Sequence, residues 1–147
     1  MSAKINIVNK KAGYNYHLEE KYIAGIALTG TEVKSVRNNN ASLAEAYCVF
    51  KNHELYLVQM HISEWKYGSY LNHNPTRERK LLLQKKELRK LKKGIEAEGY
   101  TLIPVRVFTS PRGLIKIEIA LAKGKKTVDK REDIKKKDLE RELNRKF

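Results

Sequence analysis

Two long apolar segments, residues 100–108 and 114–122, constrain the fold of this chain more than any other feature. The linker between them, residues 109–113, holds a proline and a glycine, which predict a turn. In the second segment every other residue is aliphatic: Ile115, Ile117, Ile119 and Leu121. A period of two is typical of a strand that buries one face, so we expect two neighbouring strands here.

Local patterns predict further elements. Residues 22–28 are mostly apolar and few in number, which indicates a buried strand. Residues 29–32 have the Thr-x-x-Glu spacing of a capping box and predict the start of a short helix. Residues 46–50 and 55–60 predict a hairpin around a polar loop. Residues 85–95 carry leucine and isoleucine at helical spacing and predict a second, amphipathic helix.

These segments divide the chain into one domain, residues 1–122, and a tail, residues 123–147. Several short strands with two helices predict a mainly β domain, and an OB-like antiparallel β-barrel with flanking α-helices is one such solution. The basic C-terminal tail has 11 basic and 6 acidic side chains with few apolar ones. We expect it to be disordered or marginally helical when free and to fold on contact with a polyanion.

The charge of the chain indicates the kind of partner. It has 31 lysines and arginines against 17 aspartates and glutamates, a formal net charge of +14. Such an excess favours nucleic acid, with an anionic membrane surface as the competing partner. No apolar run approaches the ~20 residues that span a bilayer, and the first residues lack the apolar core of a secretion signal. We therefore expect a cytoplasmic protein, and a monomer.

Two basic clusters are candidates for RNA binding. The first, residues 9–11, precedes Tyr14 and Tyr16, and cations beside stackable rings suit phosphates and unpaired bases. A solvated turn with two core tyrosines explains these residues equally well. The second, residues 77–93, has 9 basic and 2 acidic side chains. Such density repels itself unless it meets an anion, although a solvated helix face is the alternative.

The sequence offers little for catalysis. Cys48, the lone cysteine, lies in an apolar run and is expected to be buried. Glu32 and Lys34 form an E-x-K half-motif that a metal-dependent nuclease could use. Its partner carboxylate is missing, and the capping box already accounts for Glu32. We therefore expect a binding protein that is not an enzyme and needs no cofactor or metal.

Four stretches, in their order along the chain, resemble the SsrA-binding protein (small protein B) family. They are residues 9–12, residues 24–37 (AGIALTGTEVKSVR), residues 75–83 and residues 120–126 (ALAKGKK), the last followed by Asp-Lys-Arg. Together they span nearly the whole chain. The resemblance implies an OB-like barrel with flanking helices that binds the tRNA-like domain of transfer-messenger RNA in bacterial ribosome rescue.

The resemblance and the basic clusters together give the candidate RNA-binding residues: Asn9, Lys10, Lys11, Tyr16, Lys34, Arg37, Arg77, Arg79, Lys80, Leu82, Gln84, Lys116, Lys123, Lys125 and Lys126. The family's tail motif, used at the ribosomal decoding centre and not in free-RNA binding, is matched by Asp129, Lys130 and Arg131. The chain departs from the family pattern at four positions: Gly13, Tyr14, Ile23 and Val128. At Ile23 an acidic residue is common in the family.

The resemblance also implies the partners. Transfer-messenger RNA and the ribosome are direct partners, with the tail entering the vacant messenger channel and the domain standing in for a missing anticodon arm. Elongation factor Tu and alanyl-tRNA synthetase are implied only through the RNA. The alternatives are a structural protein bound permanently to ribosomal RNA and the nuclease described above.

Overall fold

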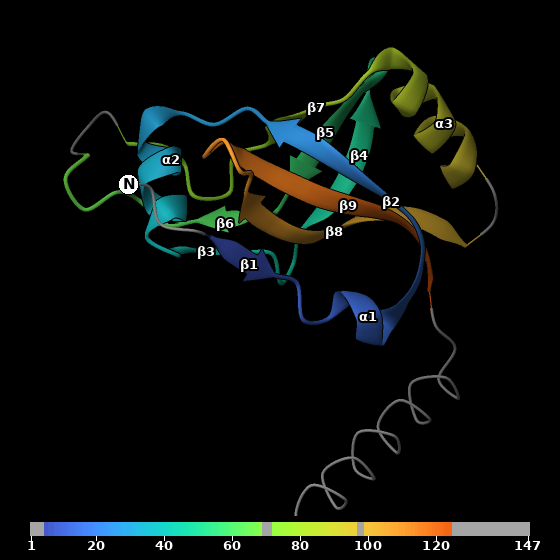
Figure 1. Cartoon of the computed structure of the whole chain (residues 1–147), viewed down its shortest axis with the longest axis horizontal. Coiled ribbons are helices and arrows are strands. Elements are labelled where there is room, and N and C mark those ends of the chain that lie inside the picture. Colours follow the sequence, from blue (N-terminus) through green and yellow to red (C-terminus); the bar gives the residue numbers. More distant parts are fainter. Residues whose placement is uncertain (1–4, 69–71, 97–98, 125–147) are drawn as a thin grey trace, which may run out of the picture.

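The computed structural model describes residues 5–68, 72–96 and 99–124 of the chain. Its elements, in chain order, are β1 (Asn6–Val8), α1 (Ala12–Asn15), β2 (Tyr16–Ile26), α2 (Gly30–Arg37), β3 (Ala41–Ser42), β4 (Tyr47–Lys51), β5 (Glu54–Val58), β6 (His61–Ile62), β7 (Arg79–Leu82), α3 (Lys85–Ile95), β8 (Tyr100–Thr109) and β9 (Ile115–Gly124). Figure 1 shows α2 and α3 near opposite ends of the molecule, with the longest strands between them.

Seven of the strands form one antiparallel sheet, in the order β1-β8-β9-β2-β7-β5-β4. The predicted pair of β8 and β9 lies within it, and β2 pairs with the other edge of β9. Ile117 and Ile119 on β9 are fully buried, while Lys116 and Glu118 are only partly covered. The alternation in the sequence therefore predicted both the strand and its buried face.

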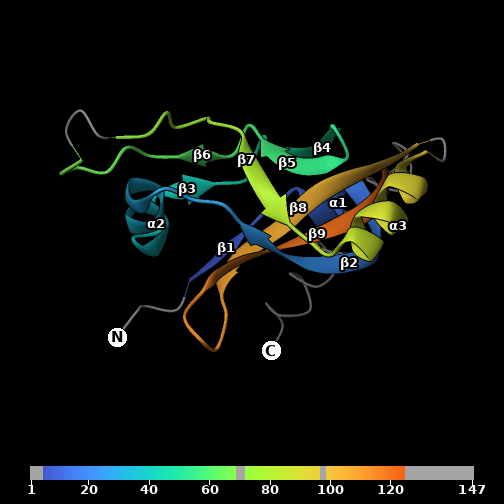
Figure 2. The same ribbon diagram turned by 90° about the horizontal axis from the view of Figure 1, so that it is seen from above.

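The sheet curls, but it does not close into a barrel. Its edge strands are β1 and β4, and no backbone ladder joins them within the described residues. β4 instead approaches β8, so that the β4–β5 hairpin folds over the sheet (Figure 2). The mainly β fold with flanking helices is confirmed, and the sheet that was expected to form an OB-like barrel is open within the described residues. β1 has 3 residues and β4 has 5, which is little backbone for a closing ladder.

The helix α2 begins where the capping box predicts. Thr29 Oγ1 accepts the Glu32 N–H at 3.4 Å, and Glu32 Oε1 accepts the Thr29 N–H at 2.8 Å. Val36 is fully buried and fixes the inner side of the helix. Asn39, just beyond the helix, has a left-handed φ of 59°, a conformation that asparagine tolerates better than most residues.

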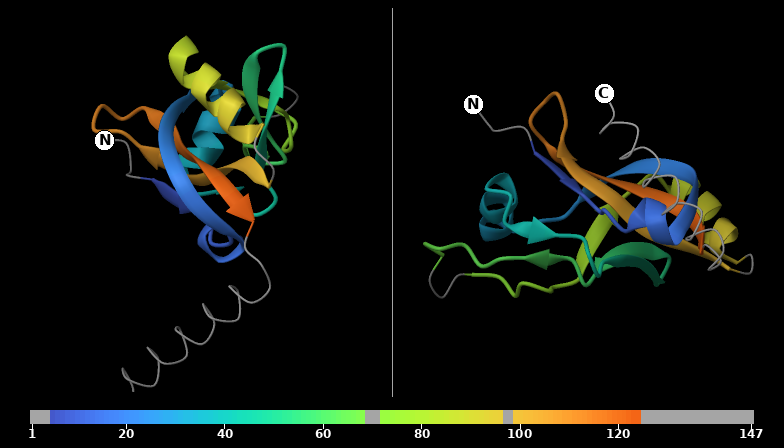
Figure 3. Two further views of the ribbon diagram at one scale, coloured as in Figure 1. Left: turned by 90° about the vertical axis from the view of Figure 1, so that its right-hand side faces the viewer. Right: turned by 90° about the horizontal axis from the view of Figure 1, so that it is seen from below.

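The helix α3 also spans its predicted range and covers one end of the curled sheet (Figure 3, left). Leu91 is fully buried, and Leu88 and Ile95 pack against the same core. Gly94 allows this close approach, because a Cβ at that position would lie 2.8 Å from a methyl carbon of Leu121. Within the described ranges, no helix has the length and apolar character needed to cross a membrane.

The hairpin of β4 and β5 is confirmed as well. Its turn residues Asn52 and His53 have φ values of 50° and 66°, and two consecutive positive values are typical of the tight turns that fit the strand twist. Cys48 on β4 is buried as predicted. Burial raises the pKa of its thiol to about 12, so the thiol stays protonated and unreactive at neutral pH.

Candidate RNA-binding surface

One face of the sheet points away from the core and crosses five strands. The strand register places one row across β7, β2, β9, β8 and β1: Leu82, Gly25, Lys116, Phe108 and Asn6. The adjacent row crosses β2, β9, β8 and β1: Ile23, Glu118, Arg106 and Val8. We call these two rows the outer sheet face. Residues from five separate segments of the chain thus form one surface.

Apolar side chains on the outer sheet face are strongly exposed. Ile23 is 58% exposed, Leu82 53% and Val8 48%. Gly25 keeps the surface low beside Leu82, because a Cβ at Gly25 would lie 3.2 Å from the Cβ of Leu82. Exposed apolar surface rimmed by polar groups marks an interaction site. Riboses and unpaired bases are partners that such side chains can contact.

Positive charge surrounds these apolar residues. Glu118 is the single acidic residue of the two rows, and Arg106 Nε at 2.9 Å and Lys21 Nζ at 3.7 Å neutralise it. The Arg106 guanidinium carbon also lies 4.2 Å from the centroid of the Phe108 ring, a cation–π contact. Lys116 adds a further cation in the first row. The combination of cations and flat apolar groups suits an RNA strand.

A buried ion cluster fixes the strand that presents Leu82. The fully buried Glu32 carboxylate accepts from Arg77 Nη2 at 2.5 Å and from Arg79 Nε at 2.5 Å. Arg79 also donates to the carbonyl oxygens of Met60 and Pro75, at 2.6 and 3.1 Å. The cluster ties α2 to β7, to Met60 between β5 and β6, and to Pro75 in the connection between β6 and β7. β7 is therefore held in place before any ligand arrives.

The electrostatics of this cluster keep Glu32 ionised. Burial by itself raises the pKa of Glu32, but hydrogen bonds from Arg77, the Thr29 backbone and Arg79 bring it down from 4.5 to about 2. Burial lowers the pKa of Arg79, and the Glu32 carboxylate opposes that effect. The Glu32 carboxylate of the E-x-K half-motif is thus paired with two guanidinium groups. Within the described ranges, no three His, Cys, Asp or Glu side chains gather as metal ligands would.

The buried position of Arg79 corrects one prediction. The sequence places Arg79 among the RNA-binding residues, but its guanidinium has no exposed surface. Arg79 therefore acts within the fold, because its charge is needed by Glu32. Arg77 is divided between two roles, since its side chain is 39% exposed while it donates to Glu32. Gln84 is the N-cap of α3, and its backbone N–H donates to the Glu87 carboxylate at 3.2 Å.

The predicted N-terminal cluster lies beside α1 (Figure 3, right). Asn9 is buried, and its Nδ2 donates to the Pro104 carbonyl oxygen at 2.9 Å. Asn9 therefore anchors the turn of residues 9–11 that precedes α1, while Lys10 and Lys11 are exposed. Tyr16 is partly buried in a small cluster beneath the turn. Asn9 and Tyr16 hold the turn that presents the two lysines.

The other predicted residues are spread over the molecule. Lys34 is exposed on α2, and Arg37 Nη2 donates to the Gly113 carbonyl oxygen at 3.1 Å. Lys123 lies near the end of β9, with its Nζ 5.7 Å from the centroid of the Tyr100 ring. Lys80, on the same side of β7 as Leu82, is half-exposed. Five predicted residues lie outside the described ranges: Lys125, Lys126, Asp129, Lys130 and Arg131.

Comparisons with known proteins identify the family. The family described as "SmpB protein" matches residues 6–147. The chain belongs to the SmpB family. The "SsrA-binding protein" of Christiangramia forsetii is 51% identical to it, over 99% of this chain and 92% of the relative. That of Phocaeicola vulgatus is 54% identical, over 97% of this chain and 95% of the relative.

Solved structures agree with this assignment to the SmpB family. A chain from the work described as "tmRNA-SmpB: a journey to the center of the bacterial ribosome" matches with a TM-score of 0.70 and 43% identity. The match covers 83% of this chain and 85% of that chain. The resemblance based on residues 24–37 and 120–126 is therefore confirmed.

Several residues of the outer sheet face in this SmpB-family chain were not singled out from the sequence: Gly25, Arg106 and Phe108. Arg106 and Phe108 flank the buried Val107, so alternation along β8 was an available signal. Their neighbours on β2 and β7 depend on strand register, which local patterns do not specify. Ile23 was predicted to lie in a buried strand and was noted as a departure from the family pattern, but it lies on this same face and is 58% exposed.

Proposed function

We propose that this SmpB-family chain binds the tRNA-like domain of transfer-messenger RNA through the outer sheet face and acts in trans-translation. The observation that carries the proposal is the row of apolar and cationic residues across β7, β2, β9 and β8. The relatives named SsrA-binding protein and the solved tmRNA-SmpB structure support the choice of RNA. The curled, open sheet then serves as an OB-like platform.

We expect two kinds of RNA contact on this surface, one to phosphates and one to riboses or bases. Lys80 and Lys116 meet phosphates and release counterions, so affinity falls as salt rises. Leu82 and Ile23 lie against riboses or unstacked bases. Because the Glu32 cluster already fixes β7, little ordering is needed on binding. Lys10, Lys11 and Lys34 supply further phosphate contacts outside the outer sheet face.

The proposal extends to the ribosome. The tail motif, Asp129 to Arg131, acts at the decoding centre, and Lys125 and Lys126 add phosphate contacts on the way to it. The match of this motif to the family pattern and the ribosome named with the solved relative support this role. Elongation factor Tu and alanyl-tRNA synthetase act through the RNA. The chain itself works in the cytoplasm as a monomer, without catalysis or a cofactor.

Substituting Lys116, in the same row as Leu82, together with Lys80, two residues before Leu82 on β7, tests the proposed surface. The Lys80→Ala/Lys116→Ala variant should bind a tRNA-like domain transcript less tightly, and its salt slope should shrink by about 1.5, since each phosphate contact contributes about 0.7–0.9. The matched control is Lys86→Ala/Lys90→Ala, which removes the same charge from exposed positions of α3. Filter binding at several salt concentrations measures both quantities. Equal losses in the two variants would reject the outer sheet face.

The apolar part of the surface has a separate signature. Leu82→Ala should weaken binding of the same transcript by about fivefold, because roughly 1 kcal/mol of apolar contact is lost. Its salt slope should equal that of the parent protein, because no charge changes. An affinity equal to the parent's would remove Leu82 from the interface.

A further inference from the structure

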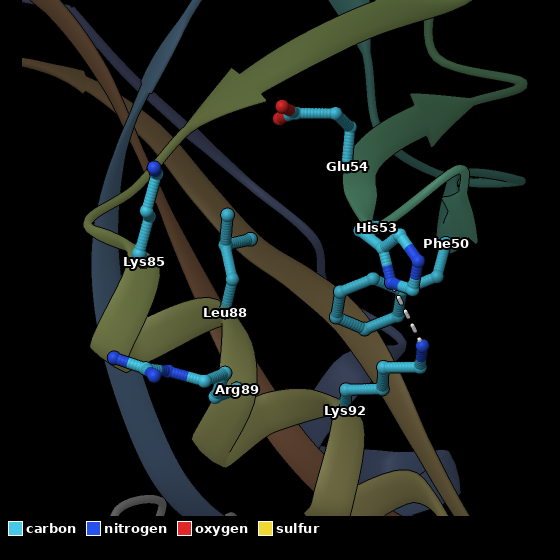
Figure 4. Close-up of a pocket in the computed structure, with 7 residues that line it drawn as sticks. All are labelled: Phe50, His53, Glu54, Lys85, Leu88, Arg89 and Lys92. Carbon is cyan, nitrogen blue, oxygen red and sulfur yellow. Dashed lines mark hydrogen bonds between the residues drawn. The ribbon is translucent and has the colours of Figure 1, made fainter.

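A groove lies between the β4–β5 hairpin and α3, beside the outer sheet face. The hairpin contributes Phe50, His53 and Glu54, and α3 contributes Lys85, Leu88, Arg89 and Lys92 (Figure 4). Its volume is about 310 Å³, at the small end of the range for ligand pockets. The helix residues lie within the basic cluster 77–93 predicted from the sequence, whereas Phe50, His53 and Glu54 lie outside both predicted clusters.

The groove has an apolar floor and a cationic rim. Phe50 and Leu88 form the floor, and both are partly buried against the core. Lys85, Arg89 and Lys92 form the rim on the helix side, because positions i, i+4 and i+7 lie on one side of a helix. A flat apolar floor beside three exposed cations is the arrangement that a base with its flanking phosphates requires.

His53 and Glu54 of the β4–β5 hairpin form the opposite rim of the groove. His53 occupies a left-handed turn position, with φ at 66°, and its Nδ1 lies 3.2 Å from Lys92 Nζ. A lysine ammonium can only donate, so His53 Nδ1 is the acceptor in this contact. Glu54 is held by Lys80 at 3.6 Å, which neutralises the one acid in the groove. Since Lys80 lies on β7 beside Leu82, the same ion pair links the groove to the outer sheet face.

We propose that this groove binds one unpaired nucleotide of the RNA, with its base on Phe50 and Leu88 and its flanking phosphates on Lys85, Arg89 and Lys92. The inference rests on the proposed RNA-binding function and adds a site to it. Three features favour a nucleotide: the small volume, the charge complementarity of the rim and the continuity with the outer sheet face. An acidic peptide is the other occupant that the charge would admit.

A charge-matched pair of variants on one helix tests the site. The groove variant is Lys85→Gln/Arg89→Gln/Lys92→Gln, and the control is Lys86→Gln/Lys90→Gln/Lys93→Gln. Both triples remove three exposed cations from α3, but only the first lines the groove. The groove variant should bind the tRNA-like domain transcript about tenfold more weakly, with a salt slope smaller by about 2, and the control should lose much less. Equal losses would overturn the proposal.

Photo-crosslinking locates the base directly. A short single-stranded RNA carrying 4-thiouridine is irradiated on the full-length protein, and the modified peptides are identified by mass spectrometry. Crosslinks should fall within residues 50–54 and 85–92, and the groove variant should lose them. Crosslinks confined to other segments would overturn the site. Crosslinks in these two segments that persist in the groove variant would overturn it as well.

Competition by an RNA duplex, together with the charge-matched variants, separates this inference from the proposed function. If the parent protein binds the tRNA-like domain no better than a duplex of equal length, the proposed function fails. If it retains that preference while the groove and control triples behave alike, only the groove proposal fails. Tighter binding of the groove to a poly-glutamate peptide than to the single-stranded RNA would assign the groove to an acidic peptide and overturn it as a nucleotide site.

Discussion

Glu32 accepts hydrogen bonds from the Thr29 backbone, Arg77 and Arg79, and so joins the start of α2 to the segment that becomes β7. The sequence predicted one of these bonds, the capping box, because its spacing is local. The two arginines lie 45 and 47 residues away, and each was interpreted as a contact for RNA. A charged residue in a basic run can thus have a partner inside the fold that sequence spacing does not reveal.

The Glu32 carboxylate should control stability in acid. Because the pKa of Glu32 is lowered in the folded protein, its ionised carboxylate contributes stability that is fully present above about pH 4.5. This contribution is lost as the pH falls toward 2. Glu32→Gln should cost about 3 kcal/mol at neutral pH, because two arginines lose their buried partner, and should flatten this acid dependence. Urea unfolding between pH 2 and 7 measures both effects.

The exposed Glu64→Gln variant is the control for that experiment, since Glu64 is on the surface. It should keep the stability of the parent at neutral pH and the same loss in acid. An E32Q protein that loses stability in acid as steeply as the parent would contradict the assignment of the low pKa to Glu32.

At the scale of elements, long periodic segments were predictable and short ones were not. Strands β8 and β9, the β4–β5 hairpin and both longer helices follow the sequence patterns within a few residues. The missed elements are β1, α1, β3, β6 and β7, of 2 to 4 residues each. These are too short to show a period, and tertiary pairing specifies them. β7 was missed inside the basic run, and with it the buried position of Arg79.

The turn of the β4–β5 hairpin provides an element-scale prediction. His53 has a positive φ, which glycine adopts without the steric cost that other residues meet. His53→Gly creates the Asn-Gly pair favoured in such turns and should stabilise the protein by about 0.5–1 kcal/mol. His53→Ala, the control, should be no more stable than the parent. Thermal unfolding measures all three, and a lower melting temperature for His53→Gly would refute the account of this turn.

At the scale of the whole molecule, the net charge of +14 favours attraction to RNA, and the outer sheet face is where we propose that RNA is held. The family resemblance gave the partner from the sequence alone. The surface needed the structure, because Leu82, Gly25, Lys116 and Phe108 come together only through strand register. Composition alone would have assigned every exposed lysine an equal share in RNA binding.

Deleting residues 129–147 should separate the two jobs of the chain. The outer sheet face remains, so affinity for the tRNA-like domain should stay within about twofold of the parent. Peptide tagging on stalled ribosomes in a reconstituted translation system should be lost, because the predicted decoding-centre motif is gone. A truncated protein that still tags at the parent's rate would refute the role given to the tail.

The most direct measurement of the central claim is a competition assay at physiological salt. Labelled tRNA-like domain transcript is bound to the full-length protein and then challenged with unlabelled transcript or with an RNA duplex of equal length and charge. The folded-surface account predicts that the duplex competes at least about tenfold less well, since both RNAs offer similar phosphate charge but different shape. Equal competition by the two RNAs would show that charge alone binds RNA and would contradict the account.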